Sequence, residues 1–416
     1  MNRKRSGESN RNMSEGNIVI VIDPGHGGLG GGADDGASYN GITERYINTA
    51  TAKAMCEELS KYDNVKVYLT RDNPNQAMTL KQRAEFASDM GADYLISIHY
   101  NASEEHLIYG SEVWIPSIGE YYAQGYGIGK AVLDEFQDMG LYLKGVKTRV
   151  GDGNDEYYGI IRESEKLNIT GMIIEHCYID NGRDYAYYGN DDAYVRFGKA
   201  DATGVAKALG LKSTELGKDY TMYKGIDIAI PDSRVYQDET PPEVILKKCS
   251  SNGNGIVEIV IHAQDSESEI SHYAYSFDGG NTYSELFEWH DRDGDNEESI
   301  TIMNVRQNRA DVVVRAYNNY NLYSTSEMVV LNGINGVFEE ENISESVEST
   351  LTVDQQNNVI SNEKVRYDNR RTAMVIVILL FIIILTLFFK SAIAASLKKW
   401  YHSIKDIILK NGKDEK

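Results

Sequence analysis

The sequence predicts an α/β domain with a mostly parallel sheet flanked by helices, followed by an all-β immunoglobulin-like sandwich and a C-terminal transmembrane helix. Strand and helix patterns alternate over residues 17–211, which is typical of an α/β layer. Only short strand patterns separated by turn residues follow over residues 241–333. Residues 372–389 form an uncharged, almost wholly apolar run that is long enough to cross a bilayer as a helix.

The overall composition limits the classes of partner that this protein can bind. The formal net charge is −21 at pH 7, whereas nucleic-acid binding requires a clustered basic surface, so no nucleic-acid partner is expected. The three cysteines are odd in number and show no paired spacing, so no disulfide framework is expected. At 416 residues the chain exceeds what one hydrophobic core usually supports, which favours several domains.

A buried strand at residues 18–22 is the first predicted element. The preceding residues 1–16 are polar and are expected to be disordered, and no apolar run of signal-peptide length follows their basic residues. Five consecutive β-branched apolar residues make up the strand. Pro24 and Gly25 end it, so His26 lies just beyond its carboxyl end, where open α/β sheets bind ligands.

Helical periodicity and short apolar runs predict the other elements of this domain. A glycine-rich loop leads to a helix over residues 44–60, with Thr43 as its N-cap. The remaining elements are a strand over residues 65–69, a helix marked by Leu80, Ala84 and Ala87, a strand over residues 111–115, a helix over residues 121–139 and a helix ending near Gly210.

Two further strands end, like the first, in a side chain that can bind metal or carry protons. The strand at residues 93–98 leads directly to His99, and the strand at residues 170–174 leads to Glu175. Because parallel strands present their carboxyl ends at one edge of a sheet, these side chains are expected to converge there with His26.

Together with Glu44, these residues suit a zinc site with a general base. Zinc in hydrolases is usually held by three protein ligands that leave a fourth position for water. His26, Glu44 and His99 would supply such a set, and Glu175 would move the proton. A single histidine after a strand is commonly a turn or packing residue, and Glu44 alone is a favourable charge at a helix N-terminus. The presence of a polar side chain at the carboxyl end of each of three apolar strands favours the zinc site over these alternatives.

The same residues resemble the zinc-dependent N-acetylmuramoyl-L-alanine amidases of bacteria and their phages. The resemblance covers residues 18–211 only, and its motifs are Asp23-Pro24-Gly25-His26-Gly27-Gly28, Glu44, Ser97-Ile98-His99-Tyr100-Asn101-Ala102 and Glu175. It implies that His26, Glu44 and His99 bind Zn²⁺ and that Glu175 is catalytic. The implied reaction is hydrolysis of the amide bond between N-acetylmuramic acid and L-alanine, which makes peptidoglycan the substrate.

The sequence departs from the family pattern after the catalytic glutamate. The family usually has a Gly-Phe pair one residue on, whereas this chain reads His176-Cys177-Tyr178, so a local change of shape without loss of chemistry is expected. His176 is expected to be structural rather than a second proton carrier, because neighbours on a strand point to opposite faces. Asn101 is a candidate for orienting a metal ligand or for capping a loop. No long helical insertion separates His99 from Glu175, which predicts an open site.

The C-terminal half is predicted to contain a β-sandwich that a spacer connects to a transmembrane helix. Residues 212–240 are expected to form a linker, and residues 241–333 form the predicted sandwich, which is most simply a spacer or a wall-contacting module. Residues 334–371 are a polar, acidic spacer, and residues 372–390 are the predicted transmembrane helix. Residues 391–416 predict a basic amphipathic tail that suits an anionic inner leaflet.

The expected location follows from the substrate and from the flanking charges. Basic residues are slightly more numerous after the apolar run, which favours a cytoplasmic C-terminus. A single-pass protein of the cell membrane, with its catalytic domain on the cell-wall side, is therefore expected. The missing signal peptide favours the alternative, in which the N-terminal domains are cytoplasmic.

Parts of the sequence are compatible with two functions other than hydrolysis. Gly25, Gly27 and Gly30 match a dinucleotide-binding motif, but glycine-rich sequence continues to Gly41 where that motif must open into a helix. The more serious alternative is a membrane-anchored peptidoglycan-binding protein with an inactive amidase-like domain. The presence of all four expected side chains favours the enzyme.

Overall fold

The computed structural model describes most of the chain between residues 17 and 335. The described ranges are 17–28, 34–190, 192–291 and 294–335. The predicted disordered N-terminus, the transmembrane helix and the basic tail lie outside these ranges, as does all but the first two residues of the acidic spacer. Within these ranges, no helix has both the length and the apolar character needed to span a bilayer.

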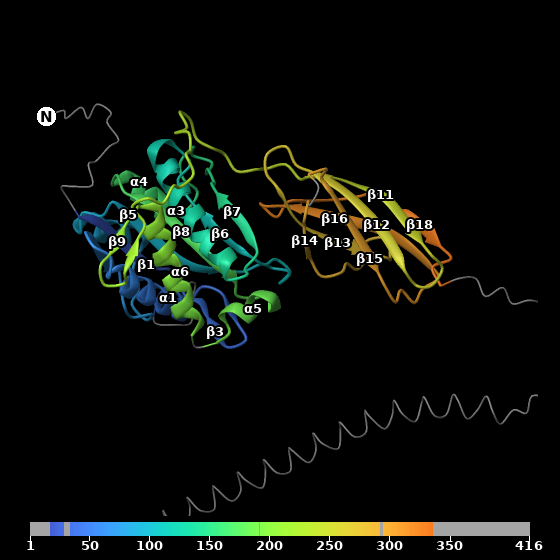
Figure 1. Cartoon of the computed structure of the whole chain (residues 1–416), viewed down its shortest axis with the longest axis horizontal. Helices are drawn as coiled ribbons and strands as arrows, with labels where there is room; N and C mark the ends of the chain where they lie inside the picture. Colours follow the sequence, from blue (N-terminus) through green and yellow to red (C-terminus); the bar gives the residue numbers. More distant parts are fainter. Residues whose placement is uncertain (1–16, 29–33, 191, 292–293, 336–416) are drawn as a thin grey trace, which may run out of the picture. The chain divides into compact units, whose positions relative to one another are not determined.

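A six-stranded sheet forms the centre of the first domain (Figure 1). Its strand order is β4-β1-β5-β8-β6-β7, and every neighbouring pair is parallel except β6 and β8. The mostly parallel sheet predicted from the sequence is therefore confirmed. The strands are β1 (Ile18–Pro24), β4 (Val65–Leu69), β5 (Tyr94–Asn101), β6 (Ser111–Trp114), β7 (Leu143–Lys147) and β8 (Thr170–Tyr178).

Helices cover both faces of this sheet (Figure 1). Ile20 and Ile22 of β1 belong to the core formed with α1, α3 and α6, whereas Val21 between them belongs to the core formed with α2 and α4. Successive strand residues point to opposite faces, so an unbroken apolar run is buried on both sides. The helices are α1 (Glu44–Leu59), α2 (Leu80–Asp89), α3 (Gly119–Asp138), α4 (Gly159–Lys166), α5 (Gly182–Tyr188) and α6 (Ala193–Ala208).

The predicted helices with strong periodicity are confirmed, as are the short strands β4 and β6, whereas several other short elements were missed. α1 and α3 begin and end within two residues of the prediction. Thr43 occupies the N-cap position of α1, as predicted, although its side chain makes no capping hydrogen bond. β7 was missed because Leu143–Lys147 contains a glycine and two lysines, which do not read as a strand. A hairpin of β2 (Ser38–Tyr39) and β3 (Ile42–Thr43) precedes α1.

The segment predicted as a linker, residues 212–240, is described throughout and lies against the first domain. Its regular structure is a small hairpin of β9 (Lys212–Ser213) and β10 (Lys218–Asp219). Arg234 then donates a hydrogen bond to the hydroxyl of Ser117 at 2.8 Å and forms an ion pair with the buried Glu156.

Two antiparallel sheets follow and share one apolar core. Val257, Ile259 and Ile261 of the first sheet pack there with Val312 and Val314 of the second. We call this region the β domain; its immunoglobulin-like identity stays a prediction. The first sheet contains β11 (Glu243–Ser251), β12 (Val257–Gln264) and β15 (Glu297–Ile302), and the second contains β13 (Ile270–Ser276), β14 (Phe287–Glu288), β16 (Arg309–Asn318), β17 (Tyr323–Thr325) and β18 (Val329–Asn332).

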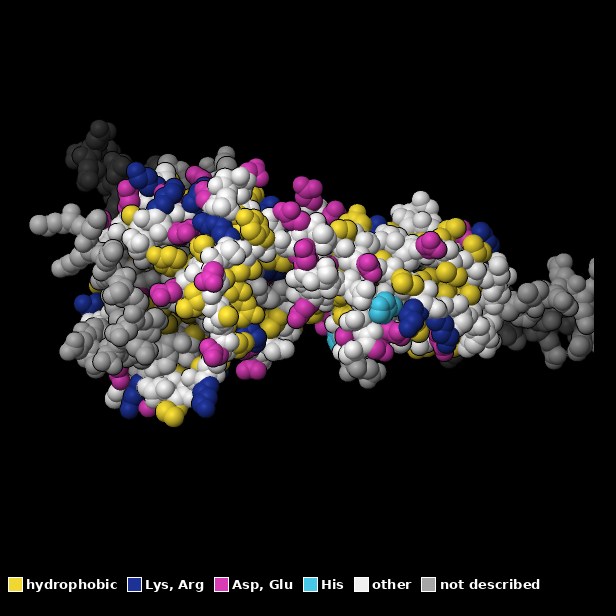
Figure 2. Space-filling model, turned by 90° about the horizontal axis from the view of Figure 1, so that it is seen from above, with side chains coloured by type: hydrophobic (Ala, Val, Ile, Leu, Met, Phe, Trp, Pro, Cys, Tyr) yellow, Lys and Arg dark blue, Asp and Glu magenta, His cyan; other side chains and the backbone are white. Residues whose placement is uncertain are grey.

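The described residues of both domains fall in one compact unit. On the face of the molecule shown in Figure 2, acidic, basic and apolar side chains are interspersed. Among the described residues seen on this side, no large block of one charge stands out.

Candidate metal centre and active site

His26 lies just past the carboxyl end of β1, in a backbone conformation that only a tightly held residue adopts. Its φ angle is 59°, which is uncommon for a residue with a side chain. Two buried arginines hold the neighbouring carbonyl groups. Arg71 donates to the carbonyls of Pro24 and Gly25 at 2.9 and 2.8 Å, and Arg83 donates to those of Pro24 and His26. The turn that presents His26 is thus fixed by charge-assisted hydrogen bonds.

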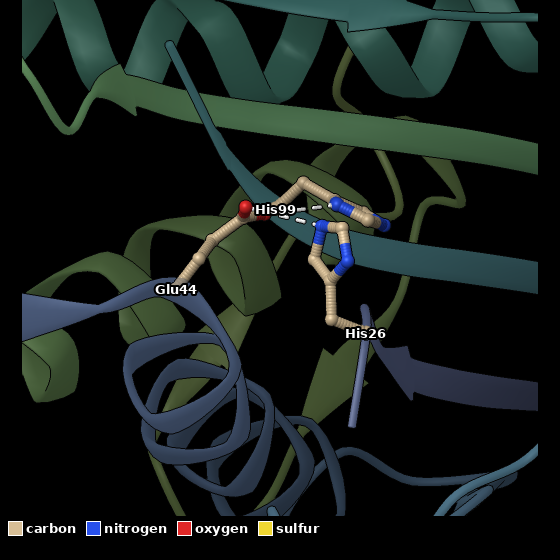
Figure 3. Close-up of side chains that lie close together, drawn as sticks. All are labelled: His26, Glu44 and His99. Carbon is tan, nitrogen blue, oxygen red and sulfur yellow. Dashed lines mark hydrogen bonds and ion pairs between the residues drawn. The ribbon is translucent and has the colours of Figure 1, made fainter. Parts of the chain in front are cut away.

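Glu44 lies between the two histidines (Figure 3). Its Oε2 atom is 3.1 Å from Nε2 of His26, and its Oε1 atom is 3.0 Å from Nδ1 of His99. The imidazole ring centroids are 4.9 Å apart, and one donor atom from each of the three residues lies within 4.8 Å of the others. The three predicted ligands therefore come together, as a common ion would require.

Two glycines make room for these side chains. A Cβ atom on Gly25 would lie 2.2 Å from the ring of His99, and one on Gly36 would lie 2.3 Å from Oε2 of Glu44. Gly36 also has a φ angle of 71°, which favours glycine. The glycine-rich composition around His26 thus follows from the close approach of backbone to the candidate ligands.

The electrostatics of the cluster keep Glu44 ionised. Burial alone raises the pKa of the Glu44 carboxyl, but hydrogen bonds and attraction from His26 and His99 outweigh it and hold the pKa well below its usual range. Burial lowers the pKa of His99, against the opposing attraction of Glu44. An ionised Glu44 carboxylate and a neutral His99 imidazole are the donor states that zinc requires of these two residues.

Glu175 lies directly beside this cluster on β8. It pairs across the sheet with His99 of β5, and its Oε2 atom is buried without a hydrogen-bond partner among the described residues. Burial, together with repulsion from Glu44 and from Glu112, raises the pKa of Glu175 well above its usual range. The structure therefore places all four predicted residues at one edge of the sheet, with one carboxylate ionised and the other driven towards its neutral form.

The first domain matches a known protein family. The profile of the family described as N-acetylmuramoyl-L-alanine amidase matches residues 20–207. Residues 20–207 belong to the N-acetylmuramoyl-L-alanine amidase family. We call this part of the chain the amidase domain from here on.

Curated relatives of the amidase domain carry the same description. The N-acetylmuramoyl-L-alanine amidase CwlM of Bacillus licheniformis is 29% identical over 195 residues, covering 47% of this chain and 70% of that protein. The sporulation-specific N-acetylmuramoyl-L-alanine amidase of Bacillus subtilis (strain 168) is 28% identical over 213 residues, covering 50% of this chain and 74% of that protein. Both matches are confined to about half of this chain.

Solved structures also match about half of the chain. The catalytic domain of CwlV, an N-acetylmuramoyl-L-alanine amidase from Bacillus (Paenibacillus) polymyxa var. colistinus, is 26% identical with a TM-score of 0.40, covering 47% of this chain and 99% of that one. Cwp6 from Clostridium difficile is 27% identical with a TM-score of 0.42, covering 47% of this chain and 30% of that one.

A buried network behind Glu175 was not predicted from the sequence. Glu112 of β6 pairs with Glu175 across the antiparallel β6–β8 contact and forms an ion pair with Lys147 of β7 at 2.6 Å. The other oxygen of Glu112 accepts hydrogen bonds from Asn101 at 2.8 Å and Trp114 at 3.2 Å. Asn101 supports Glu112 through its amide, and its side-chain oxygen accepts a hydrogen bond from the N–H of Ala102 at 2.8 Å, which bears out the loop-capping alternative.

The sequence offered one signal for this network. Glu112 is a carboxylate directly before the apolar residues Val113 and Trp114 of the same strand, and such a group needs a partner when it is buried. Its partner could not be found from the sequence, because Lys147 lies 35 residues away on a strand that the pattern did not reveal.

His176 has the structural role expected for the strand neighbour of Glu175. It is fully buried, and its Nε2 atom lies 2.9 Å from Oδ2 of the equally buried Asp201 on α6. Its Nδ1 atom lies 2.9 Å from the backbone carbonyl of His99. His176 thus links α6 to the strand that carries a candidate ligand.

Proposed function

We propose that this chain is a zinc-dependent amidase that hydrolyses the bond between N-acetylmuramic acid and L-alanine in peptidoglycan. The observation that carries the proposal is the convergence of His26, Glu44 and His99 beside Glu175 at one edge of the sheet. Membership of the amidase family supports the choice of substrate and bond.

The residues present suit a zinc ion. His26, Glu44 and His99 would offer one ring nitrogen each from two imidazoles and one carboxylate oxygen, a donor set found in zinc hydrolases. About 28% of the His26 side chain and 19% of the His99 side chain is exposed, so the imidazoles face an accessible edge. When bound, zinc would polarise the scissile carbonyl and acidify a water molecule.

Neighbouring backbone groups orient the Glu44 carboxylate within this set. The N–H groups of Ala37 and Tyr100 donate to its two oxygens at 2.9 and 3.2 Å, and the amide of Asn48 donates to Oε1 at 3.1 Å. Donors that fix the orientation of a candidate ligand reduce the reorganisation needed to bind an ion. Asn48 also donates to the carbonyl of Gly25, which ties α1 to the turn that presents His26.

Glu175 is the group that moves the proton. Its carboxyl has a raised pKa, which suits a residue that accepts a proton from water and later gives one to the leaving amine near neutral pH. Its buried Oε2 atom lacks a partner among the described residues, so the carboxyl is free to take up that proton. The alternative function is a peptidoglycan-binding protein whose amidase domain is inactive.

We also propose a cell-membrane location, with the apolar run at residues 372–390 as a single anchor and the amidase domain on the cell-wall side. The location of peptidoglycan outside the membrane supports this orientation. Protease treatment of intact cells tests it: digestion of the amidase domain is expected, and its survival would favour the cytoplasmic alternative.

The activity is tested with purified cell wall and the full chain. The protein is expected to release free stem peptides, to lose that activity on chelation and to regain it with added Zn²⁺. Binding to wall material without release of stem peptides would contradict the enzyme and support the binding protein.

A further inference from the structure

A turn of the β domain reaches the network behind the catalytic glutamate. The turn comprises residues 319–321, between β16 and β17, and is internally braced. The side-chain oxygen of Asn318 accepts hydrogen bonds from the N–H groups of Tyr320 at 3.0 Å and Leu322 at 2.9 Å. Asn321 adopts a left-handed conformation with a φ angle of 67°, as turns that contain asparagine often do. The 319–321 turn therefore holds its hydrogen-bond acceptors in a defined arrangement.

This turn bonds to two buried lysines of the amidase domain. Nζ of Lys147 donates to the backbone carbonyl of Asn319, and Nζ of Lys144 donates to the side-chain oxygen of Asn321. Both lysines belong to β7 and have at most 3% of their surface exposed. A buried ammonium group is costly without hydrogen-bond acceptors, and the turn supplies one to each lysine.

Tyr320, at the centre of the turn, covers the Lys147 ammonium. Nζ of Lys147 lies 5.3 Å from the ring centroid of Tyr320 and 5.3 Å from that of Trp114, so the two aromatic rings flank it. The Tyr320 hydroxyl lies within 3.4 Å of both the N–H and the carbonyl of Thr148, the residue that follows β7. Tyr320 thus contacts both the charge and the backbone of this strand end.

The covered lysine leads directly to the catalytic glutamate. Lys147 pairs with Glu112, and Glu112 lies opposite Glu175 in the antiparallel pairing of β6 and β8. A second buried acidic side chain opposite Glu175 is costly unless its charge is balanced, and Lys147 balances that of Glu112. Shielding from water strengthens the attraction between Lys147 and Glu112.

We propose that the 319–321 turn is a positioning element of the active site, with Tyr320 as its central residue. By covering the Lys147–Glu112 pair, the turn fixes β6 against β8 and thereby the placement of Glu175. The inference rests on the proposed amidase function and adds to it a role for the β domain in the reaction rate, beyond that of a spacer.

The test compares variants of the full chain in zinc content and in kcat and KM on a soluble muramyl peptide. Tyr320→Ala is expected to keep its zinc and a KM within about twofold while kcat falls about tenfold, because small misplacements far from the chemistry lower the rate of the reacting complex. Tyr320→Phe keeps the ring and should restore most of kcat. Ile259→Val, which removes one methyl group from the β-domain core, is the control and should keep kcat.

Each result that would overturn the inference can be recognised separately. A folded Tyr320→Ala protein with the wild-type kcat overturns the inference, and so does an equal loss of kcat in Ile259→Val, which would indicate a general loss of stability. If Tyr320→Ala does not fold, Asn321→Ala decides by the same criterion: a lowered kcat at unchanged KM supports the inference, and the wild-type kcat overturns it. A wild-type protein without amidase activity overturns the proposed function and this inference with it.

Discussion

The amidase domain and the β domain differ in what they bury. The interior of the amidase domain holds many buried ionisable groups, among them Glu44, Arg83, Glu112 and Lys147, each at most 4% exposed. In the described part of the β domain, the buried side chains of β11 to β18 include no aspartate, glutamate, lysine or arginine. Buried charge is expensive and persists where partners and function require it. The contrast indicates that the chemistry belongs to the first domain, while the second supplies apolar packing and backbone acceptors.

The largest expected effect separates a histidine of the candidate metal site from a surface histidine of the β domain. His99→Ala should lose both zinc and amidase activity, because a three-ligand site rarely keeps its ion with two ligands. Metal analysis and release of stem peptides measure the two losses. His290→Ala, at an exposed position, is the control and should retain both. Full zinc content in His99→Ala would contradict the ligand assignment.

The next variant separates metal binding from proton transfer. Glu175→Gln should retain zinc but lower kcat by about 10³-fold, because the amide side chain does not exchange the proton that general acid–base catalysis requires. Glu258→Gln on the exposed face of β12 provides the matched control, with unchanged kcat expected. Wild-type turnover by the Glu175 variant would remove this residue from the mechanism.

The contrast in buried charge itself can be tested with two ion pairs. Lys147→Met leaves Glu112 buried without its cation and should lower the free energy of unfolding by about 3–5 kcal/mol. Lys248→Met breaks the exposed pair with Glu258 in the β domain and should cost at most about 1 kcal/mol. Denaturant titrations measure both. Equal effects would show that burial of charge does not distinguish the two regions.

The smallest expected effect is a pH dependence due to Lys144, at the contact between the regions. Burial, assisted by repulsion from Lys147, lowers the pKa of Lys144 to about 7. Between that value and its ordinary value of 10.5, the unfolded chain binds the proton more readily than the folded chain. The contribution of Lys144 to stability should therefore rise with pH over this window.

Melting temperatures measured between pH 7 and about pH 9 provide the check on Lys144. The difference between the wild-type protein and Lys144→Met should change with pH in the direction that favours the wild type at higher pH. Lys53→Met, on the exposed side of α1, is the control, and its difference from the wild type should stay constant. A constant difference for Lys144→Met would mean that this lysine is not desolvated in solution.

Much of the candidate site could be predicted because it depends on where strands end. An apolar β-branched run followed by proline and glycine predicts both the burial of β1 and the position of His26. The apolar runs of β5 and β8 were predicted in the same way, but both strands continue past the predicted ends, to Asn101 and Tyr178, so His99 and Glu175 lie within their strands near the carboxyl ends. Parallel strands place such residues at one edge whatever their order in the sheet, so convergence could be expected before the topology was known.

The support of the site could not be predicted in the same way. Leu143–Lys147 carries two lysines in five residues, a pattern that indicates a solvent-exposed loop. Both lysines are buried because the 319–321 turn, about 170 residues further on in the sequence, covers them. The sequence around β7 gives no indication that a distant turn covers these two lysines.

The amino-acid sequence by itself determined the alternation of strands and helices, the amidase-family motifs and the four side chains offered for chemistry. Only the tertiary structure decided the strand order, the antiparallel placement of β6 beside β8, and the burial of Glu112, Lys144 and Lys147. The physical reason is the range of the interactions. Periodicity and chain-breaking residues act over a few positions, whereas the burial of a charge depends on partners supplied by distant segments.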